Sequence, residues 1–135
     1  MKTFSNILIP NFPMHKKILY TCNMANQQLI KGSLSTIVLH LLQNAGEMYG
    51  YEITQKVKQL TADEIKLTEG ALYPTLHKLE AEGTLTTESR KVDGRVRKYY
   101  RLTEEGKKAT SERMEELEAF LLNMQRVLGF NLKLG

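Results

Sequence analysis

The fold is decided by residues 67–102, which read LTEGALYPTLHKLEAEGTLTTESRKVDGRVRKYYRL. The first half of this stretch has apolar residues at helical spacing, namely Leu72, Leu76 and Leu79. The second half has two short extended runs on either side of Asp93-Gly94, a dipeptide typical of tight hairpin turns. The sequence therefore predicts a helix followed by a β-hairpin.

Small, aromatic and polar side chains share the face of this helix that lies opposite its apolar stripe. At 100° per residue these side chains are Gly70, Tyr73, Pro74 and His77. A helix with such a free face, followed by a basic hairpin, has the layout of a DNA recognition helix and its wing. We therefore predict a mainly α fold with a small β-hairpin that contacts double-stranded DNA.

Pro74 is the ambiguous position in the predicted recognition helix. At the sixth helical position a proline removes a backbone donor and normally kinks or breaks the helix. One alternative is a helix that begins at Pro74, with residues 68–73 as a turn. We favour a longer helix, capped by Thr68 and ended by Gly83, because the apolar stripe stays in register across the proline.

The charges of the chain are distributed unevenly. Its 135 residues carry a formal net charge of +4, which alone is weak support for a nucleic-acid partner. Residues 90–101 contain six basic side chains against Asp93, a balance of +5, whereas residues 104–118 contain three basic and six acidic side chains, a balance of −3. The hairpin should attract phosphate and the segment after it should repel phosphate.

Several classes of protein are excluded or disfavoured by the composition. The single cysteine, Cys22, excludes an internal disulfide and a cysteine-based zinc site, and it fits a reducing cytoplasm. No apolar run approaches the ~20 residues that span a bilayer, and the N-terminal residues do not resemble a signal peptide. His15, His40 and His77 are scattered, and no catalytic triad or phosphate-binding loop is evident. We expect no enzyme activity, no metal and no cofactor.

The chain divides into three predicted parts. Residues 1–23 show no helical or strand period and form a loose arm, which either contacts DNA phosphates through its lysines or is an extension of a protein that begins at Met24. Residues 24–102 form the DNA-binding domain. Residues 103–135 form a C-terminal dimerisation helix.

Two further helices are predicted before the recognition helix, at residues 30–42 and 48–60, each from an apolar stripe. Either Ser33 or Ser35 is expected to cap the first. Tyr49 and Tyr51 stand at the start of the second, where free N–H groups favour a phosphate. Their hydroxyls either contact DNA or pack within the protein. Residues 66–67 are a possible short strand.

A last helix should run from Thr103, its cap, to about Leu128. At ~1.5 Å per residue it would be about 37 Å long, too long to bury its apolar seam on a three-helix core. The seam either pairs with a second copy in a two-fold dimer, which we favour, or folds back on its own chain. The seam residues, spaced 3, 4, 3 and 4, are Met114, Leu117, Leu121, Met124 and Leu128.

Four residues of this helix suggest a second role. Met and Phe side chains adapt to hydrophobic ligands, so these four residues either line an effector cavity or pack in the core. The four are Met114, Leu117, Phe120 and Leu121.

With these residues in place, the chain resembles the PadR family of bacterial transcriptional regulators, in the group that has a single C-terminal helix. The resemblance implies a winged helix-turn-helix head, a helical dimer stem, and repression that a small molecule or stress signal relieves. It also supports a recognition helix that continues through Pro74. The matching pieces are LIKGSLSTIVLHLL at 29–42, MYGYEI at 48–53, LTEGALYPTLHKLEAEGTL at 67–85 and GRVRKYYRLTEEGK at 94–107.

The chain departs from the family pattern in three respects. The residues before Met24 are not part of that pattern. Val96 stands where many members have proline, which predicts a looser wing turn. Tryptophan is absent, so the tryptophan-lined drug pocket of some relatives does not carry over.

We expect a homodimeric transcriptional repressor that places two recognition helices in successive major grooves, roughly 34 Å apart, on an inverted-repeat operator. Its other partner would be a hydrophobic or aromatic effector. Because residues 68–83 carry one lysine against three glutamates, the wing must supply most of the attraction to phosphate. The predicted DNA contacts are Tyr49, Thr68, Gly70, Tyr73, Pro74, His77, Lys78, Arg90, Arg95, Arg97 and Lys98.

Two alternatives remain open for this function. His77 either becomes protonated and makes DNA binding pH-sensitive, or stays a neutral surface residue. The whole protein is alternatively an interaction module that uses the winged helix and the C-terminal helix without specific DNA binding. Such a module would show no salt-sensitive affinity for duplex DNA.

Overall fold

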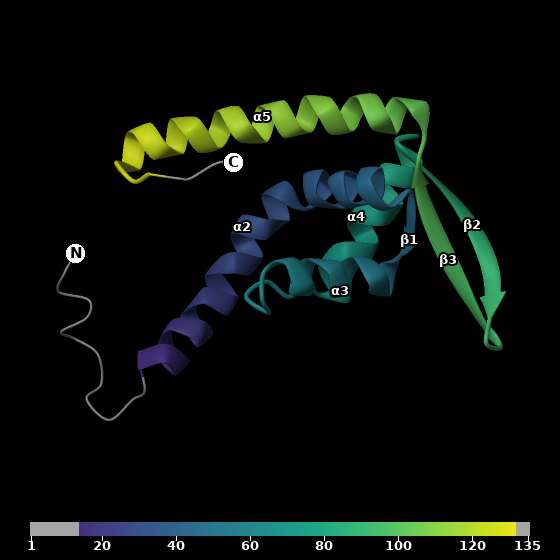
Figure 1. The fold of residues 1–135 in the computed structure, drawn as a ribbon, viewed down its shortest axis with the longest axis horizontal. Helices are drawn as coiled ribbons and strands as arrows, with labels where there is room; N and C mark the ends of the chain where they lie inside the picture. Colours follow the sequence, from purple (N-terminus) through teal and green to yellow (C-terminus); the bar gives the residue numbers. More distant parts are fainter. Residues whose placement is uncertain (1–13, 132–135) are drawn as a thin grey trace.

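The structure, a computed structural model, describes the backbone of residues 14–131 and the side chains of residues 27–131. Helices and a small sheet form a head domain, and the two longest helices, the first and the last, reach out from it (Figure 1). The predicted fold class, mainly α with a β-hairpin in a winged helix-turn-helix, is confirmed. In chain order the elements are α2 (Met14–Ala45), β1 (Glu47–Tyr49), α3 (Gly50–Leu60), α4 (Glu69–Ala81), β2 (Leu85–Val92), β3 (Arg95–Leu102) and α5 (Glu104–Leu128).

The core of the head lies between α2, α3, α4 and a three-stranded antiparallel sheet of order β1-β3-β2. The predicted stripe of α4 is completely buried, which leaves the opposite face of α4 at the surface. Burial of apolar side chains on all of these elements supplies the main driving force for the fold. The fully buried side chains include Leu34, Val38, Leu39, Leu42, Ile53, Leu72, Leu76, Leu79 and Tyr100.

Helix α2 is longer than the sequence suggested. A helix was predicted at residues 30–42 and a loose arm at 1–23, but α2 runs without interruption from Met14 to Ala45. No proline occurs within this span, so nothing in the local chain ends the helix at its N-terminal side. Residues 14–23 are therefore helical, and the boundary expected at Met24 falls inside α2. The remainder of the arm, residues 1–13, lies outside the described residues.

The serine cap expected for this helix is also wrong. Ser33 lies inside α2, and its hydroxyl donates to the carbonyl of Ile30 at 3.4 Å. This is the bond that a serine in a helix interior makes to the preceding turn.

Strand β1 was not predicted. The second helix was expected to start at residue 48, but Glu47–Tyr49 pair with β3, and Met48 lies opposite Tyr100. Gly46, with φ of +85°, turns the chain from α2 into this strand. A strand of three residues depends on its neighbour for hydrogen bonds, so its own sequence gives little sign of it.

The short strand considered at residues 66–67 does not form. The segment between α3 and α4 is a turn followed by irregular chain, in which Ala62 and Asp63 adopt left-handed φ values of 49° and 67°. Its first residue, Thr61, accepts a hydrogen bond from the backbone N–H of Ile65 at 3.0 Å. This bond, together with that from the N–H of Glu64 to the Thr61 carbonyl at 3.0 Å, closes the segment on itself.

The wing is a regular hairpin. Asp93 and Gly94, with φ of 50° and 78°, form the two-residue turn that the sequence predicted, because positive φ at both positions matches the twist of the strands. Val96 pairs with Lys91 in the ladder, so the looser turn that Val96 suggested is not seen.

Helix α5 has the predicted limits. The Thr103 hydroxyl accepts from the N–H of Gly106 at 3.0 Å, and Gly129 ends the helix with φ of 72°. Close to the wing α5 lies beside the C-terminal half of α2, and the two helices diverge toward their other ends (Figure 1). None of the helices in the described part of the chain has the length and apolarity needed to span a bilayer.

Candidate nucleic-acid interface

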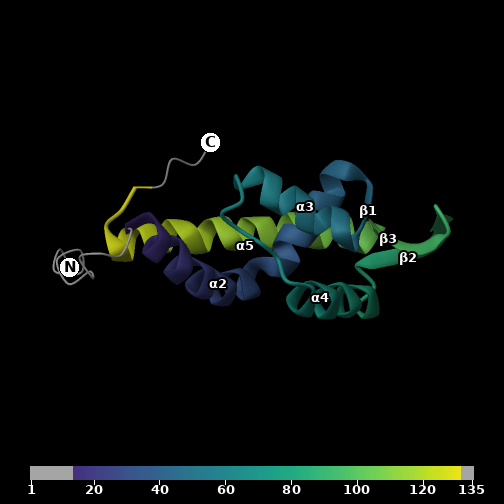
Figure 2. The same cartoon turned by 90° about the horizontal axis from the view of Figure 1, so that it is seen from below.

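Helix α4 presents all of its predicted DNA contacts on one exposed face. Thr68 caps the helix, with its hydroxyl accepting from the N–H of Ala71 at 3.2 Å. The helix continues through Pro74, as predicted. Figure 2 shows α4 at the edge of the molecule, next to the wing. The exposed residues of this face are Gly70, Tyr73, Pro74, His77 and Lys78.

The start of α3 differs from the phosphate-binding helix end that was predicted. The helix begins at Gly50 rather than at residue 48, and Tyr49 is its N-cap residue. The backbone N–H of Tyr49 donates to the Glu52 carboxylate at 3.0 Å. Because a carboxylate of the same helix already occupies this end, the positive potential there is partly neutralised.

Tyr49 packs on the outer face of the sheet. Its ring meets the edge of Tyr99, with centroids 5.5 Å apart, and stacks on Tyr51 at 6.4 Å. The Arg97 guanidinium lies over the Tyr49 ring, 4.7 Å from its centroid. The Tyr49 ring is therefore packed among aromatic and cationic side chains, whereas the Tyr51 side chain is mostly exposed.

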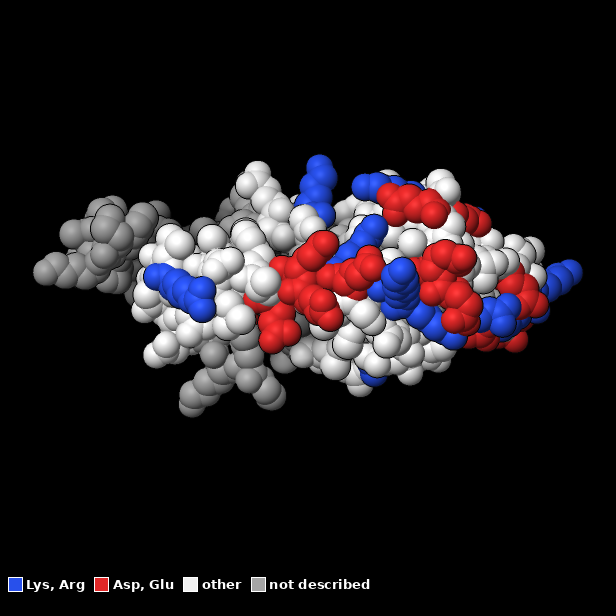
Figure 3. Space-filling view, turned by 90° about the horizontal axis from the view of Figure 1, so that it is seen from above, with Lys and Arg blue, Asp and Glu red and all other residues white. Residues whose placement is uncertain are grey.

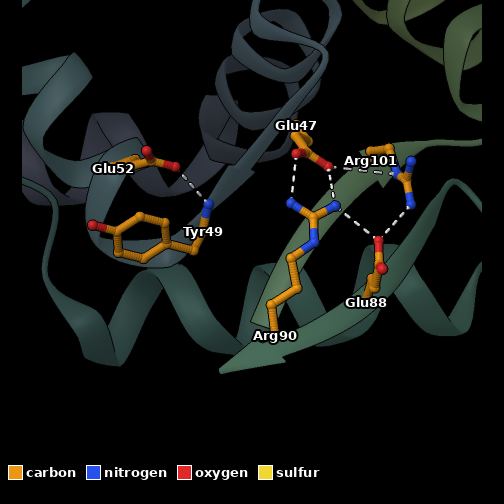
Figure 4. A network of polar contacts seen from close by, with 6 residues as sticks. All are labelled: Glu47, Tyr49, Glu52, Glu88, Arg90 and Arg101. Atoms are coloured by element: carbon orange, nitrogen blue, oxygen red, sulfur yellow. Dashed lines mark hydrogen bonds and ion pairs between the residues drawn. The ribbon is translucent and has the colours of Figure 1, made fainter. Parts of the chain in front are cut away.

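Four charged side chains form a network on the same face of the sheet (Figure 4). The Arg90 guanidinium donates two bonds to the Glu47 carboxylate, at 2.7 and 2.8 Å, and one to Glu88 at 2.8 Å. Arg101 donates to Glu88 at 3.0 Å. The hydrogen bonds from Arg90 hold the pKa of both carboxyl groups below the ordinary glutamate value. Arg90 therefore joins β1 to β2, and its charge is already paired.

A second ion pair joins the wing to the recognition helix. The Lys98 ammonium donates to the Glu80 carboxylate of α4 at 3.0 Å, and the Thr87 hydroxyl donates to the other oxygen at 2.8 Å. The bonds from Lys98 and then Thr87 lower the pKa of Glu80, and the bond to Glu80 raises the pKa of Lys98. Lys98 is thus paired as well.

The other two predicted wing cations have no carboxylate partner among the described residues. Arg95 is exposed beside the turn, and Arg97 is half-buried on Tyr49. The predicted wing cations thus divide into a paired set, Arg90 and Lys98, and an unpaired set, Arg95 and Arg97.

Sequence reasoning missed the two carboxylates that make this division. Glu47 is 43 residues from Arg90 and Glu80 is 18 residues from Lys98, so no local spacing links them. In the sequence Glu80 is one of three glutamates on an amphipathic helix and has no distinguishing feature.

The structure also places the proposed effector residues. Met114 and Leu117 line an apolar cavity of about 210 Å³ that α5 forms with α2 and α3. Phe120 and Leu121 are not part of its lining. Within the described residues, no group of three acidic, His or Cys side chains could hold a metal ion.

The C-terminal half of α5 carries few charged side chains, Glu118 and Arg126. Figure 3 shows acidic side chains over the middle of this helix and few charges toward its end. Of the predicted seam, Leu117, Leu121 and Met124 are half-buried in the single chain, while Leu128 is 64% exposed.

Comparison with known proteins agrees with this geometry. A family model described as the transcriptional regulator PadR-like family matches residues 38–112. The transcriptional regulator Rv3488 of Mycobacterium tuberculosis is 42% identical over 86 residues, which cover 62% of this chain and 78% of that protein.

Solved structures show the same similarity. A transcriptional regulator from Clostridium thermocellum superposes with a TM-score of 0.65 at 31% identity, over 76% of this chain and 95% of that one. A PadR family transcriptional regulator from Eggerthella lenta superposes with a TM-score of 0.63 at 28% identity, over 87% of this chain and 94% of that one.

Proposed function

The chain belongs to the PadR-like family of transcriptional regulators, and from this premise we propose that it is a homodimeric repressor of an inverted-repeat operator, released by a small molecule or stress signal. The observation that carries the proposal is the exposed face of α4 beside a wing in which Arg95 and Arg97 have no carboxylate partner among the described residues. A protruding helix reads base edges, and flanking cations bind phosphates of any sequence.

The proposed DNA contacts follow from this arrangement. Helix α4 enters the major groove, where Tyr73, His77 and Thr68 reach base edges or phosphates. Gly70 and Pro74 allow close approach of the helix, and Lys78 adds a phosphate contact at its edge. In the wing, Arg95 and Arg97 bind phosphate, with Tyr49 supporting Arg97. Arg90 and Lys98, which were also predicted to bind phosphate, are assigned here to holding the wing in place.

The proposed dimer forms through α5. Its seam leaves Met114 and Leu128 exposed in the single chain, and the C-terminal half of α5 diverges from α2 (Figure 1). A second copy related by a two-fold axis would cover this surface. The same axis would place two α4 helices on successive major grooves.

The proposed effector is a small hydrophobic or aromatic compound. It would bind in the cavity that includes Met114 and Leu117, which lies between the proposed dimer helix and α3. A ligand there could change the angle between α5 and the DNA-binding head. The cavity of about 210 Å³ is smaller than the roughly 300–1,000 Å³ of most ligand pockets, which favours a compact ligand.

A DNA-binding titration tests the proposal. An operator is first selected from random duplexes, or sought upstream of the gene by footprinting, and its affinity is measured over a range of salt concentrations. We expect two protected half-sites about one helical turn apart, and an affinity that falls as salt rises. A protein that does not bind duplex DNA at low salt would instead be the interaction module.

A further inference from the structure

Glu80 connects the two parts of the proposed DNA-binding surface. It lies near the end of α4, and its side chain is 33% exposed. One carboxylate oxygen accepts from the Thr87 hydroxyl of β2 and the other from the Lys98 ammonium of β3. In the hairpin Thr87 is paired with Tyr100, whose buried side chain places this face of the wing against α4. Glu80 is thus anchored to both wing strands.

We propose that Glu80 is a specificity-determining residue: it withholds Lys98 from DNA phosphates and keeps the wing in register with the recognition helix. This inference rests on the proposed function. Through Lys98, Glu80 would act as a positioning residue and would not touch the DNA itself.

Lys98, like Arg90, has a carboxylate partner that competes with phosphate, but the partner of Lys98 belongs to α4. Its ammonium lies 3.0 Å from Glu80 and 5.5 Å from the centre of the Tyr100 ring, yet its side chain is 41% exposed. A phosphate could therefore approach Lys98 from solvent, but it would have to displace the carboxylate. Arg95 and Arg97, which have no such partner in the described structure, need no displacement.

The effect on specificity follows from the kind of contact that Lys98 could make. Phosphate contacts carry no sequence information, so a freed Lys98 would strengthen binding to every duplex. It would strengthen non-specific complexes more, because there the wing can shift to the nearest phosphate without losing base contacts. In the operator complex α4 constrains the position of the wing. By holding Lys98, Glu80 therefore lowers the affinity for random duplex DNA and preserves the discrimination between the operator and random DNA.

The test is a double-mutant cycle of Glu80→Gln and Lys98→Met, measured on an operator and on random duplex DNA. Glutamine keeps the size of the side chain and an acceptor for the Thr87 hydroxyl. We expect Glu80→Gln to steepen the salt dependence on random duplex by about one phosphate contact, a slope of ~0.9. Its affinity should then fall about 3.5-fold more than that of wild type between roughly 50 and 200 mM salt. The ratio of operator to random affinity should fall several-fold.

Two arms separate this effect from simple removal of a negative charge. In the Lys98→Met background, Glu80→Gln should leave the salt slope unchanged. Glu69→Gln removes one charge from the first turn of the same helix, where the described residues include no ion pair, and should not steepen the slope. If either of these two comparisons shows a steepening of the salt slope as large as that of Glu80→Gln in the wild-type background, the proposal is overturned.

The remaining outcomes are equally decisive. Lys98→Met alone should keep the wild-type slope, since the ammonium is held by Glu80; a slope lower by ~0.9 would place Lys98 on a phosphate and overturn the inference. This measurement holds even if Glu80→Gln does not fold, which circular dichroism would report. If the wild type binds duplex DNA but Glu80→Gln shows the wild-type salt slope, the inference about Glu80 is overturned and the proposed function is not. A wild-type protein that ignores duplex DNA overturns the proposed function as well.

Discussion

The phenol ring of Tyr73 lies against the α-carbon of Gly50. A methyl group at position 50 would come within 2.5 Å of the Tyr73 hydroxyl oxygen and 2.8 Å of its Cζ atom. This contact sets the recognition helix α4 against the start of α3. The Tyr73 side chain is also 36% exposed, so one ring both packs the head and faces solvent on the proposed DNA side.

Gly50→Ala is therefore expected to push the Tyr73 ring out of its place. Overpacking of this kind costs about 1–3 kcal/mol, with the lower end expected here because the ring is at the end of a side chain that can turn. Thermal unfolding should occur at a lower temperature, and operator affinity should fall with it. Circular dichroism and an operator titration measure the two effects.

Gly70→Ala is the matched control on α4. A Cβ atom at Gly70 meets nothing within 4 Å, so alanine should raise the helix stability by about 0.5–1 kcal/mol. Operator affinity should still fall, because the methyl group stands where the helix is proposed to approach DNA. Equal stability of the Gly50 and Gly70 variants would show that the contact with Tyr73 does not constrain position 50.

Replacing Arg95 and Arg97 together with alanine tests the phosphate contacts of the wing. We expect weaker binding to every duplex and a salt slope lower by about 1.8, which corresponds to two lost contacts. Lys108→Ala removes an exposed cation that lies on α5, outside the wing, and serves as the control. A wild-type slope in the double variant would rule out the wing as the source of affinity.

The network of Glu47 and Arg90 should stabilise the sheet as a unit. Glu47→Gln and Arg90→Met should each lower the melting temperature, because each substitution breaks the bidentate ion pair and leaves the remaining charge without it. The double variant should melt no lower than the worse single variant, since residues of one network are not additive. If the two decreases in melting temperature add up in the double variant, the interaction between Glu47 and Arg90 does not contribute to stability.

The pH dependence of thermal stability should reveal the hydrogen bonds that Glu80 accepts from Lys98 and Thr87. Its bonds to Lys98 and Thr87 lower the pKa of Glu80 below the ordinary value of 4.5. The ionised carboxylate therefore favours the folded state: its contribution is fully present above about pH 4.5 and is lost as the pH falls through the lowered folded-state value. The melting temperatures of wild type and Glu80→Gln should differ near neutral pH and converge in acid. If the difference in melting temperature persists unchanged in acid, the contribution of this contact to stability does not depend on the charge of Glu80.

The proposed dimer predicts an asymmetry between two faces of α5. Leu128→Asp puts a charge on the seam and should raise the dimer dissociation constant about tenfold or more, because an unpaired charge would be buried. Ala119→Asp adds the same charge on the opposite side of the helix, 200° from Leu121 at about 100° per residue, and should leave assembly unchanged. Sedimentation equilibrium measures both. Equal weakening by the two substitutions, or a monomeric wild type, would reject the seam.

Local patterns were sufficient to predict much of the fold and part of the candidate site. The register of Leu72, Leu76 and Leu79 determined which face of α4 is exposed, and it held through Pro74. The Asp93-Gly94 turn determined the hairpin, since few dipeptides adopt positive φ at both positions. Each of these features depends on residues a few positions apart, so periodicity and turn chemistry are enough to predict it.

Only the tertiary structure decided which of the predicted cations are available. Strand β1 exists because β3 supplies its partner, and Arg90 is paired because Glu47 of that strand lies beside it. Glu80 meets Lys98 because the wing folds back over the end of α4. Residues so far apart in sequence meet through packing of whole elements, and one charge pattern along the chain is compatible with many such pairings. The sequence determined the helix and the hairpin, and their packing determined which charges remain unpaired.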